Sequence, residues 1–521
     1  MSSSKHPEDV EDVDEMLAAD DAAEEIEHDG DDDVAMDSDA EDDQQAMDMD
    51  QDEDEEVLLQ NDSIAYFDLP QDSLFTIAQH PVHASLVAVG GSAGPEDDAP
   101  GAGWLFDTSA ATSRPVLPAS YASDPAGAAG TPTTTQLDSL FSLEGHTDSI
   151  NTLCWTYPRG EYLVSGGLDG RMKVWKADVQ PGQPLNISPL GEAQEVKEIN
   201  WLAPCPSADH PNTVALGATD GSVWVYTIDS SDPSNPLQII QSYFLHTESC
   251  TAGTWTPDGL LLATVSEDSS LYAWDVWGAA ASRNMVQDNG MTAMSLTGED
   301  QRFEVEGGLY SIVTDPKGTF VAVGGAGGAV KIVSLPRLSQ STTTTSSNQR
   351  SQAQKGSRGG AKVTVSDATS GGQILASLHT QADSVETLAT TLSSTSPPTV
   401  LLASGSVDGS VVIYDATRRF AVRRHIAGAH EDQAVVKLEF LKNSWLLTSC
   451  GMDGVVRRWD LRSGGVTGTT AGGATDRGLV KEWKGHRGGG EGGGVLGFVQ
   501  GQTGERIVTA GDDGVALVFE A

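Results

Sequence analysis

From Asn61 onward, short apolar runs alternate with turns rich in glycine, aspartate and proline. Within many of these runs apolar and polar residues alternate, as in SIAYFDL, and the runs are bounded by Gly, Asp-Gly or Pro. This pattern is typical of antiparallel strands joined by tight turns, and it does not have the period of an amphipathic helix. We therefore predict an all-β fold for residues 61–521.

The runs recur as a repeated unit built around an Asp-Gly turn. The clearest copy extends from Gly145 to Lys176 and contains GHTDSINTLCW followed by YLVSGGLDGRMKVWK. In this copy and in five others an aromatic residue stands six positions after the turn aspartate; the other five end at Tyr226, Trp274, Tyr414, Trp459 and Phe519. A degenerate unit ends at Val333, and a divergent one runs from Leu74 to the strand around Trp104. The chain thus contains eight units.

These units resemble the WD-repeat family, in which each repeat forms a four-stranded blade around a central channel. The resemblance implies an eight-bladed β-propeller. Several spacers exceed the usual repeat of about 40 to 45 residues. The excess lies in low-complexity stretches, which we interpret as loop insertions near 108–136, 338–372 and 464–478 rather than as further blades.

Closure of the ring can also be predicted. The last unit ends at Ala521 after three strands, so its blade needs a fourth strand from elsewhere in the chain. The segment Ser63–Leu69, SIAYFDL, precedes the first unit and alternates as a strand does. Pairing it with the last blade would remove two open edges, and deleting it should destabilise the ring.

Charge divides the chain into two parts. Residues 1–56 are about half Asp and Glu, so we expect an acidic, disordered tail over 1–60, followed by the propeller over 61–521. The whole chain has 76 acidic residues against 30 Lys and Arg, a formal charge of −46. Such a charge favours a basic protein partner and disfavours nucleic acid and anionic membranes.

We also expect a soluble intracellular monomer, cytoplasmic with a nuclear location as an alternative, because no apolar run approaches the roughly 20 residues needed to span a bilayer. The four cysteines form no CxxC pair and have no matching histidine spacing, so neither disulfides nor a zinc site are predicted.

Four units carry a histidine, a Ser or Thr, an aspartate and an aromatic residue that together mimic a hydrolase triad. An enzyme needs one activated nucleophile, whereas copies around a ring indicate a structural hydrogen-bond network, as the WD-repeat resemblance also implies. We therefore predict no enzymatic activity, no metal site and no cofactor. The four sets are His146, Ser165, Asp169 and Trp175; His246, Thr264, Asp268 and Trp274; His379, Ser404, Asp408 and Tyr414; and His430, Ser449, Asp453 and Trp459.

The loop before the first strand of each blade is acidic. In WD-repeat propellers these loops share the usual docking face, and Lys and Arg are nearly absent from them here, Arg487 being the clearest exception. Solvated loops of an acidic protein would also carry acids by chance. The repulsion between neighbouring carboxylates favours a second interpretation, capture of a basic client. The candidate client-binding residues are Asp148, Glu195, Glu248, Glu304, Glu306, Asp383, Glu431 and Asp432.

A narrower resemblance lies between Gly145 and Val333. The segments LEGHTDSINTLCW, LLATVSEDSSLYAWD and DQRFEVEGGLYSI resemble the angio-associated migratory cell protein and its fungal counterpart, a WD-repeat ribosome-assembly protein. The resemblance implies a dedicated chaperone that binds the basic N-terminal segment of the large-subunit ribosomal protein L10 (uL16) and protects it until it reaches the pre-ribosome. It further implies that Asp148, Glu195, Glu248, Glu306, Asp383 and Asp432 contact this client.

Two other classes of function stay open at this point. One is a generic scaffold for basic proteins, for example a binder of histone tails or a substrate adaptor of a ubiquitin ligase. The other is an enzyme, which the repetition of the triad-like sets disfavours.

Overall fold

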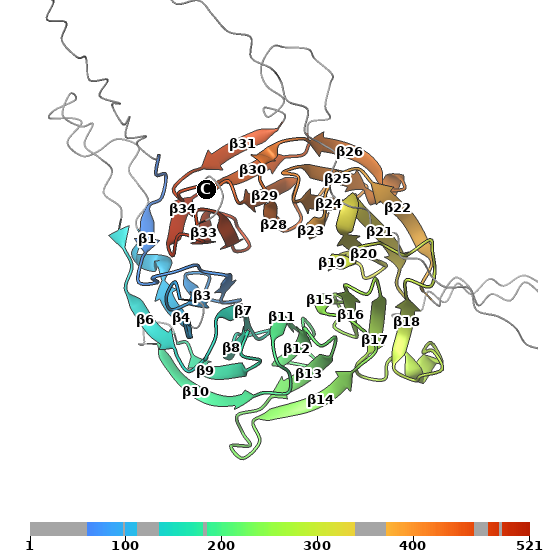
Figure 1. Ribbon diagram of the computed structural model, residues 1–521, viewed down its shortest axis with the longest axis horizontal. Coiled ribbons are helices and arrows are strands. Elements are labelled where there is room, and N and C mark those ends of the chain that lie inside the picture. The colour runs from blue at the N-terminus through green and yellow to red at the C-terminus, as the bar shows by residue number, and fades with distance from the viewer. Residues whose placement is uncertain are drawn as a thin grey trace, which may run out of the picture. The chain divides into compact units, whose positions relative to one another are not determined.

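The computed structural model describes residues 60–96, 99–111, 135–180, 185–338, 371–462, 478–488 and 492–521. Strands within these residues form eight antiparallel sheets arranged as blades around a centre (Figure 1). The prediction of an eight-bladed all-β propeller is therefore confirmed. The predicted tail and most of the three predicted insertions lie outside the described residues.

Each blade runs outward from an inner strand. Blades 1 to 4 contain β2 (Thr76–Gln79), β3 (Leu86–Ser92), β4 (Gly101–Asp107) and β6 (Ser139–Leu143); β7 (Ile150–Trp155), β8 (Tyr162–Gly167), β9 (Met172–Asp178) and β10 (Asn186–Ala193); β11 (Ile199–Pro204), β12 (Thr213–Ala218), β13 (Val223–Ile228) and β14 (Leu237–Tyr243); and β15 (Cys250–Trp255), β16 (Leu261–Ser266), β17 (Leu271–Asp275) and β18 (Thr292–Leu296).

Blades 5 to 8 follow the same order. They contain β19 (Leu309–Thr314), β20 (Phe320–Gly325), β21 (Ala329–Ser334) and β22 (Ile374–His379); β23 (Val385–Leu392), β24 (Val400–Ser406), β25 (Val411–Asp415) and β26 (Ala421–Ile426); β28 (Val435–Phe440), β29 (Leu446–Gly451), β30 (Val456–Asp460) and β31 (Leu479–Trp483); and β32 (Val495–Val499), β33 (Arg506–Gly511), β34 (Ala516–Glu520) and β1 (Ala65–Phe67).

Outside the blades, β27 (Ala429–Asp432) precedes the inner strand of blade 7. The described helices are short 3-10 turns, namely η1 (Thr108–Ala110), η3 (Ala281–Arg283), η4 (Ala326–Gly328) and η5 (Ala416–Arg418). Within the described ranges, no helix is long and apolar enough to cross a membrane.

The hydrophobic core lies between neighbouring blades. The second strands β8, β12, β16 and β20 are buried along their whole length, because both faces of a blade pack against other blades. One core cluster joins β24 and β25 to β28, β29 and β30. Each inner strand contacts the next, and β32 contacts β2, so the ring is closed.

The N-terminal strand closes the ring as predicted. Residues 65–67 form β1, which pairs antiparallel with β34 in the register Ala65↔Val518 and Phe67↔Ala516. The short strand β5 (Thr135–Gln136) pairs parallel with the other edge of β1, and this addition was not predicted. Blade 8 is thus completed by residues from the opposite end of the chain.

Candidate protein-interaction face

The loops before the inner strands lie on one face of the ring. In every blade a backbone N–H at the end of the second strand, or in the turn that follows it, donates to a carbonyl of the loop that leads into the inner strand. We call these the lead-in loops and their side the lead-in face. The donor and acceptor residues are Ser92 and Ser73, Leu168 and Ser149, Thr219 and Glu198, Glu267 and Ser249, Ala326 and Gly308, Val407 and Ser384, Met452 and Ala434, and Asp512 and Gly494.

Buried histidines fasten several lead-in loops to their blades. In blade 7, His430 Nδ1 lies 2.8 Å from Asp453 Oδ1, and its Nε2 lies 2.8 Å from Ser449 Oγ. Trp459 Nε1 donates to the same hydroxyl at 2.9 Å. Burial alone would raise the pKa of Asp453, but the hydrogen bond and charge of His430, together with Arg457, lower it overall. The carboxylate is therefore a fixed anionic acceptor in a structural network.

Two further sets have related geometry. In blade 2, His146 Nδ1 lies 3.1 Å from Asp169 Oδ1 and its Nε2 lies 2.7 Å from Ser165 Oγ, and Trp175 is buried. In blade 4 the Ser270 hydroxyl lies between the histidine and the aspartate: His246 Nδ1 is 2.6 Å from Ser270 Oγ, which in turn donates to Asp268. His246 Nε2 and Trp274 Nε1 each lie 2.8 Å from Thr264 Oγ1.

The assignment of His379 to the blade 6 set is a correction. His379 is exposed at the end of β22, and Gln381 occupies the buried position. Ser404 Oγ donates to Gln381 Oε1 at 2.5 Å, and Gln381 Nε2 donates to the Ser410 carbonyl at 2.9 Å. An amide can accept and donate at once, so it replaces a neutral imidazole. Asp408 instead accepts from the backbone N–H groups of Ala382 and Ser410.

This correction can be tested with a matched pair of substitutions. Gln381→Ala should lower the free energy of unfolding by about 1–3 kcal/mol, because it leaves the buried Ser404 hydroxyl without its acceptor. His379→Ala should change it by less than about 0.5 kcal/mol, since this side chain is exposed. Chemical denaturation of both variants measures the difference. A larger loss for His379→Ala would contradict the assignment.

Blade 8 contains a set that the sequence analysis missed. His486 Nδ1 lies 2.9 Å from Asp513 Oδ1, and Nε2 lies 2.7 Å from Thr509 Oγ1. Phe519 takes the aromatic position but has no group to donate. The sequence signal was the Gly-His pair at 485–486, which is separated from its aspartate by a longer, glycine-rich loop.

The predicted client-binding acids all lie on lead-in loops, and all of them except the partly buried Asp148 are exposed. Asp148 and Asp383 each accept a 2.7 Å hydrogen bond from the following backbone N–H. No ion pair within the described part of the chain involves any of the eight carboxylates, which are Asp148, Glu195, Glu248, Glu304, Glu306, Asp383, Glu431 and Asp432. Their negative charge is therefore available to a partner.

The register of the inner strands makes the acidic face less uniform than predicted. Asp148, Glu248 and Asp383 each stand two residues before the first residue of their inner strand. In blade 3 the equivalent residue is the exposed Lys197, because β11 begins at Ile199 and Glu195 lies four residues before it. Lys197 is thus a further basic residue among these loops, as is Arg302 of blade 5, which pairs with Asp300.

Further carboxylates on this face were not predicted. They include Glu198, Glu267, Glu386 and Asp512. Glu386 is the least expected, because it is the second residue of an inner strand. A β-bulge at this position interrupts the pairing of β23 with β24 between Val385 and Thr387. Val385 and Thr387 are buried and Glu386 between them is exposed, so its side chain points away from the core even though it stands at the bulge.

The same bulged position elsewhere ties neighbouring blades together. Asn151 Nδ2 donates to the Ile199 carbonyl at 3.2 Å, and Thr251 Oγ1 donates to the Leu309 carbonyl at 2.6 Å. Glu386 makes no such bond among the described residues and is exposed. Burial of its surroundings and the nearby Asp383 carboxylate raise the pKa of Glu386. A cation bound there would relieve this repulsion.

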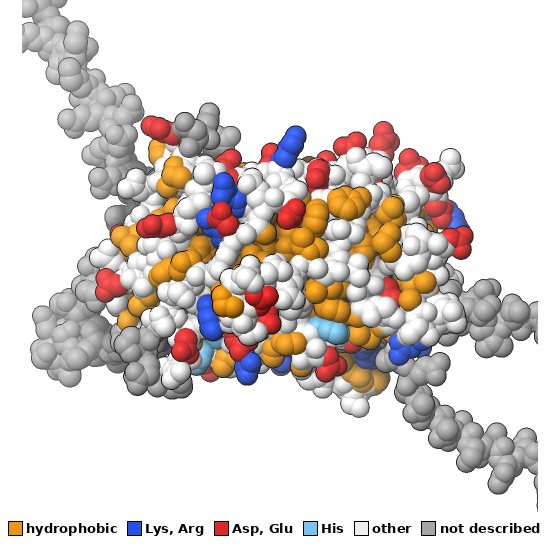
Figure 2. All heavy atoms as spheres, turned by 90° about the horizontal axis from the view of Figure 1, so that it is seen from below, with side chains coloured by type: hydrophobic (Ala, Val, Ile, Leu, Met, Phe, Trp, Pro, Cys, Tyr) orange, Lys and Arg blue, Asp and Glu red, His pale blue; other side chains and the backbone are white. Residues whose placement is uncertain are grey.

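The acids concentrate on blades 4 to 6. Burial first, and then the charges of Glu267 and Glu386, raise the pKa of the Tyr310 phenol, so both carboxylates lie near enough to act on the same hydroxyl. We call this region the acidic sector; its members are Glu248, Glu267, Glu304, Glu306, Asp383 and Glu386. Seen from the side, the ring carries acidic side chains along its upper rim, above a band with many apolar side chains (Figure 2).

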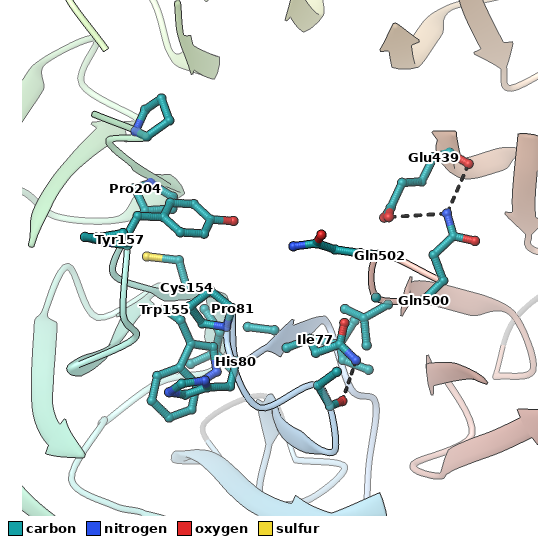
Figure 3. A pocket seen from close by; sticks show the side chains of 18 of the residues that line it. Ile77, His80, Pro81, Cys154, Trp155, Tyr157, Pro204, Glu439, Gln500 and Gln502 are labelled. Atoms are coloured by element: carbon teal, nitrogen blue, oxygen red, sulfur yellow. Dashed lines mark hydrogen bonds between the residues drawn. The ribbon is translucent and has the colours of Figure 1, made fainter. Parts of the chain in front are cut away.

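A cavity of 630 Å³ lies among the connections between first and second strands and is lined from two sides. Tyr157 and Pro204 lie on one side, and Glu439, Gln500 and Gln502 lie across from them (Figure 3). Gln500 Nε2 donates to Glu439 Oε1 at 3.3 Å. Both groups also have other partners within the protein, since Glu439 Oε2 lies 3.7 Å from Lys437 Nζ and Gln500 Oε1 accepts from Thr448 Oγ1 at 2.8 Å.

The chemistry of this cavity does not suit catalysis. Burial raises the pKa of the Cys154 thiol to about 12, so it is not a thiolate near neutral pH. Burial, followed by the neighbouring His83, lowers the pKa of His80 to about 4. Nowhere in the part of the chain that the structure describes do three or more His, Cys, Asp or Glu side chains gather as metal ligands would.

Comparison with known proteins gives a consistent result. The family "WD domain, G-beta repeat" matches residues 137–176, 237–275 and 372–415. A solved structure of Chaetomium thermophilum Sqt1 bound to the N-terminus of the ribosomal protein L10 is 54% identical; it covers 89% of this chain and 100% of that chain, with a TM-score of 0.72. Ribosome assembly protein SQT1 of Saccharomyces cerevisiae is 28% identical over 515 residues, 95% of this chain and 93% of that protein. Human angio-associated migratory cell protein is 23% identical over 389 residues, 73% of this chain and 69% of that protein.

Proposed function

This chain belongs to the Sqt1 family of WD-repeat β-propellers, and from this premise we propose that it binds the N-terminal segment of ribosomal protein L10 as a non-enzymatic chaperone for ribosome assembly. This proposal is supported by the relative that was solved bound to the N-terminus of L10, which is 54% identical and matched over 100% of its own length. The protein holds its client by contact and charge, and it releases the client unchanged.

The lead-in face is the surface that fits such a client. It presents exposed carboxylates that form no ion pair among the described residues, and a Lys- and Arg-rich segment supplies the missing charge. Guanidinium groups pair with carboxylates through two parallel hydrogen bonds. Free, the client's basic segment would bind RNA phosphate; on the ring, carboxylates take the place of phosphate.

The observation that carries the location is the set of unpaired carboxylates concentrated in the acidic sector. A partner held there by charge should associate quickly and lose affinity as salt rises. We expect a synthetic L10 N-terminal peptide to bind the full-length protein at one site. Raising the salt concentration from low to physiological should weaken this binding by about tenfold or more. Isothermal titration calorimetry at two salt concentrations measures both quantities.

The same titration distinguishes a dedicated chaperone from a general scaffold for basic proteins. A histone-tail peptide of equal length and charge should bind more weakly than the L10 peptide, because charge alone does not provide side-chain complementarity. Equal affinities for the two peptides would favour the scaffold. Absence of L10 binding at low salt would refute the proposed function.

A further inference from the structure

A second charged surface lies on the face opposite the lead-in face. Antiparallel strands reverse at alternate ends, so the connections between third and fourth strands lie away from the lead-in loops. On blades 6 and 7 these connections and the start of the outer strand β26 are rich in arginine. We call this region the arginine surface; its members are Arg418, Arg419, Arg423, Arg424 and Arg462.

The arginines form one surface because their contacts join the two blades. Arg418 Nε and Arg423 Nη1 lie 3.7 and 4.0 Å from the same Asp415 oxygen in blade 6. Arg424 Nη1 donates to the Asp460 carbonyl of blade 7 at 2.9 Å. Arg462 Nε donates to the Asp460 carboxylate at 3.0 Å.

This surface retains positive charge after its internal pairs are counted. Arg424 aside, its described side chains comprise four guanidinium groups and two carboxylates, those of Asp415 and Asp460, so positive charge is in excess. The side chains of Arg418 and Arg462 are 77% and 69% exposed, whereas Asp415 is 6% exposed. The positive charge therefore points outward and much of the negative charge is buried. Burial and the neighbouring Arg423 lower the pKa of Arg424, as expected for crowded cations.

Arginine in this number and geometry suits a phosphate backbone. The guanidinium group binds phosphate through a planar pair of hydrogen bonds and also stacks on bases, which lysine does not do. One of these groups, Arg423, already lies 4.5 Å over the ring of Trp445. An acidic protein segment would also satisfy the charge. The proposed function favours RNA, because a chaperone for ribosome assembly delivers its client to a particle made largely of RNA.

We propose that the arginine surface binds RNA, so that the protein contacts RNA on one face while it carries its client on the other. This inference rests on the proposed function for the identity of the polyanion, but not for the surface itself. It departs from the expectation of no nucleic-acid partner, which averaged the charge over the whole chain. The structure separates the two signs of charge.

The distance between the two surfaces makes this separation effective. The inner strand of blade 7 has six residues, so the ring is about 20 Å thick at about 3.3 Å per residue. The screening length at physiological ionic strength is about 8 Å. An RNA on the arginine surface is therefore governed by the local guanidinium groups more than by the acidic sector.

The test measures binding of a short fluorescent RNA hairpin to the full-length protein by anisotropy. We expect saturable binding at low salt, weakened by about tenfold in the variant Arg418→Glu/Arg462→Glu, since several phosphate contacts are lost. The control is Arg159→Glu/Lys176→Glu, an equal change of charge at exposed residues of blade 2 that should leave RNA binding unchanged. The L10 peptide should bind both variants as it binds the native protein.

Each contrary result has a distinct meaning. Absence of RNA binding at low salt, or equal weakening by the blade 2 control, would overturn the arginine surface as an RNA site. Binding of a polyglutamate peptide there without RNA binding would overturn it in favour of an acidic protein partner. Competition between the L10 peptide and the RNA hairpin would contradict the placement of their two sites on opposite faces of the ring. If the L10 peptide does not bind the native protein, the proposed function fails, whatever the result for RNA.

Discussion

Phe67→Ala is expected to lower the free energy of unfolding by about 3–5 kcal/mol, because it removes a fully buried ring from the junction of the two chain ends. Phe67 lies in β1, the strand that completes blade 8, and it stacks on Phe106 of blade 1 with centroids 4.7 Å apart. Its loss leaves a cavity between the first and last blades. Denaturation by guanidinium, followed by tryptophan fluorescence, measures the change in midpoint.

The matched control is Leu69→Ala in the same segment. Leu69 is 51% exposed and lies outside β1, so we expect its removal to cost less than about 1 kcal/mol. If both variants lose equal stability, the effect belongs to the N-terminal segment as a whole and not to packing at the closure. If neither loses stability, the ring does not depend on β1.

The repetition in the sequence explains why the fold could be predicted. Six copies of an aspartate and an aromatic residue at a fixed spacing define the turn and third strand of each blade. A last unit with three strands requires a fourth, which identifies Ser63–Leu69 as the closing segment. The pairing of Ala65 with Val518 confirms this reasoning. By contrast, β5 joins β1 through two residues only, too few to carry a pattern.

Individual site residues were harder to predict because loops carry no period. His379 was predicted to be the histidine of the blade 6 network. The residue that occupies the buried position of this network depends on where β23 begins, and in the structure it is Gln381. In blade 3 no histidine marks the loop, so Glu195 was aligned where Lys197 lies. Glu386 was missed because it is the second residue of an inner strand, outside the loop in which carboxylates were sought. Each error is a shift of a few residues in a loop or bulge.

These positions determine which charge reversals should affect binding most. The double variant Glu306→Lys/Asp383→Lys is expected to weaken binding of the L10 peptide by about 2–4 kcal/mol, which is a rise of roughly 30- to 1,000-fold in dissociation constant. Both side chains are exposed members of the acidic sector and have no ion pair in the described ranges, so reversal replaces attraction with repulsion without breaking the ring. The salt dependence of the remaining binding should fall as well.

The control variant Asp209→Lys/Glu505→Lys makes the same change of net charge on the opposite face. Both residues are exposed in connections between first and second strands, away from the lead-in loops. If binding follows the local field of the acidic sector, this control should alter affinity by less than about threefold, because its charges lie beyond a screening length from the peptide. Equal weakening by both variants would mean that the peptide responds to net charge alone, and the acidic sector would lose its assigned role. Selective weakening by the first variant places the client over blades 5 and 6.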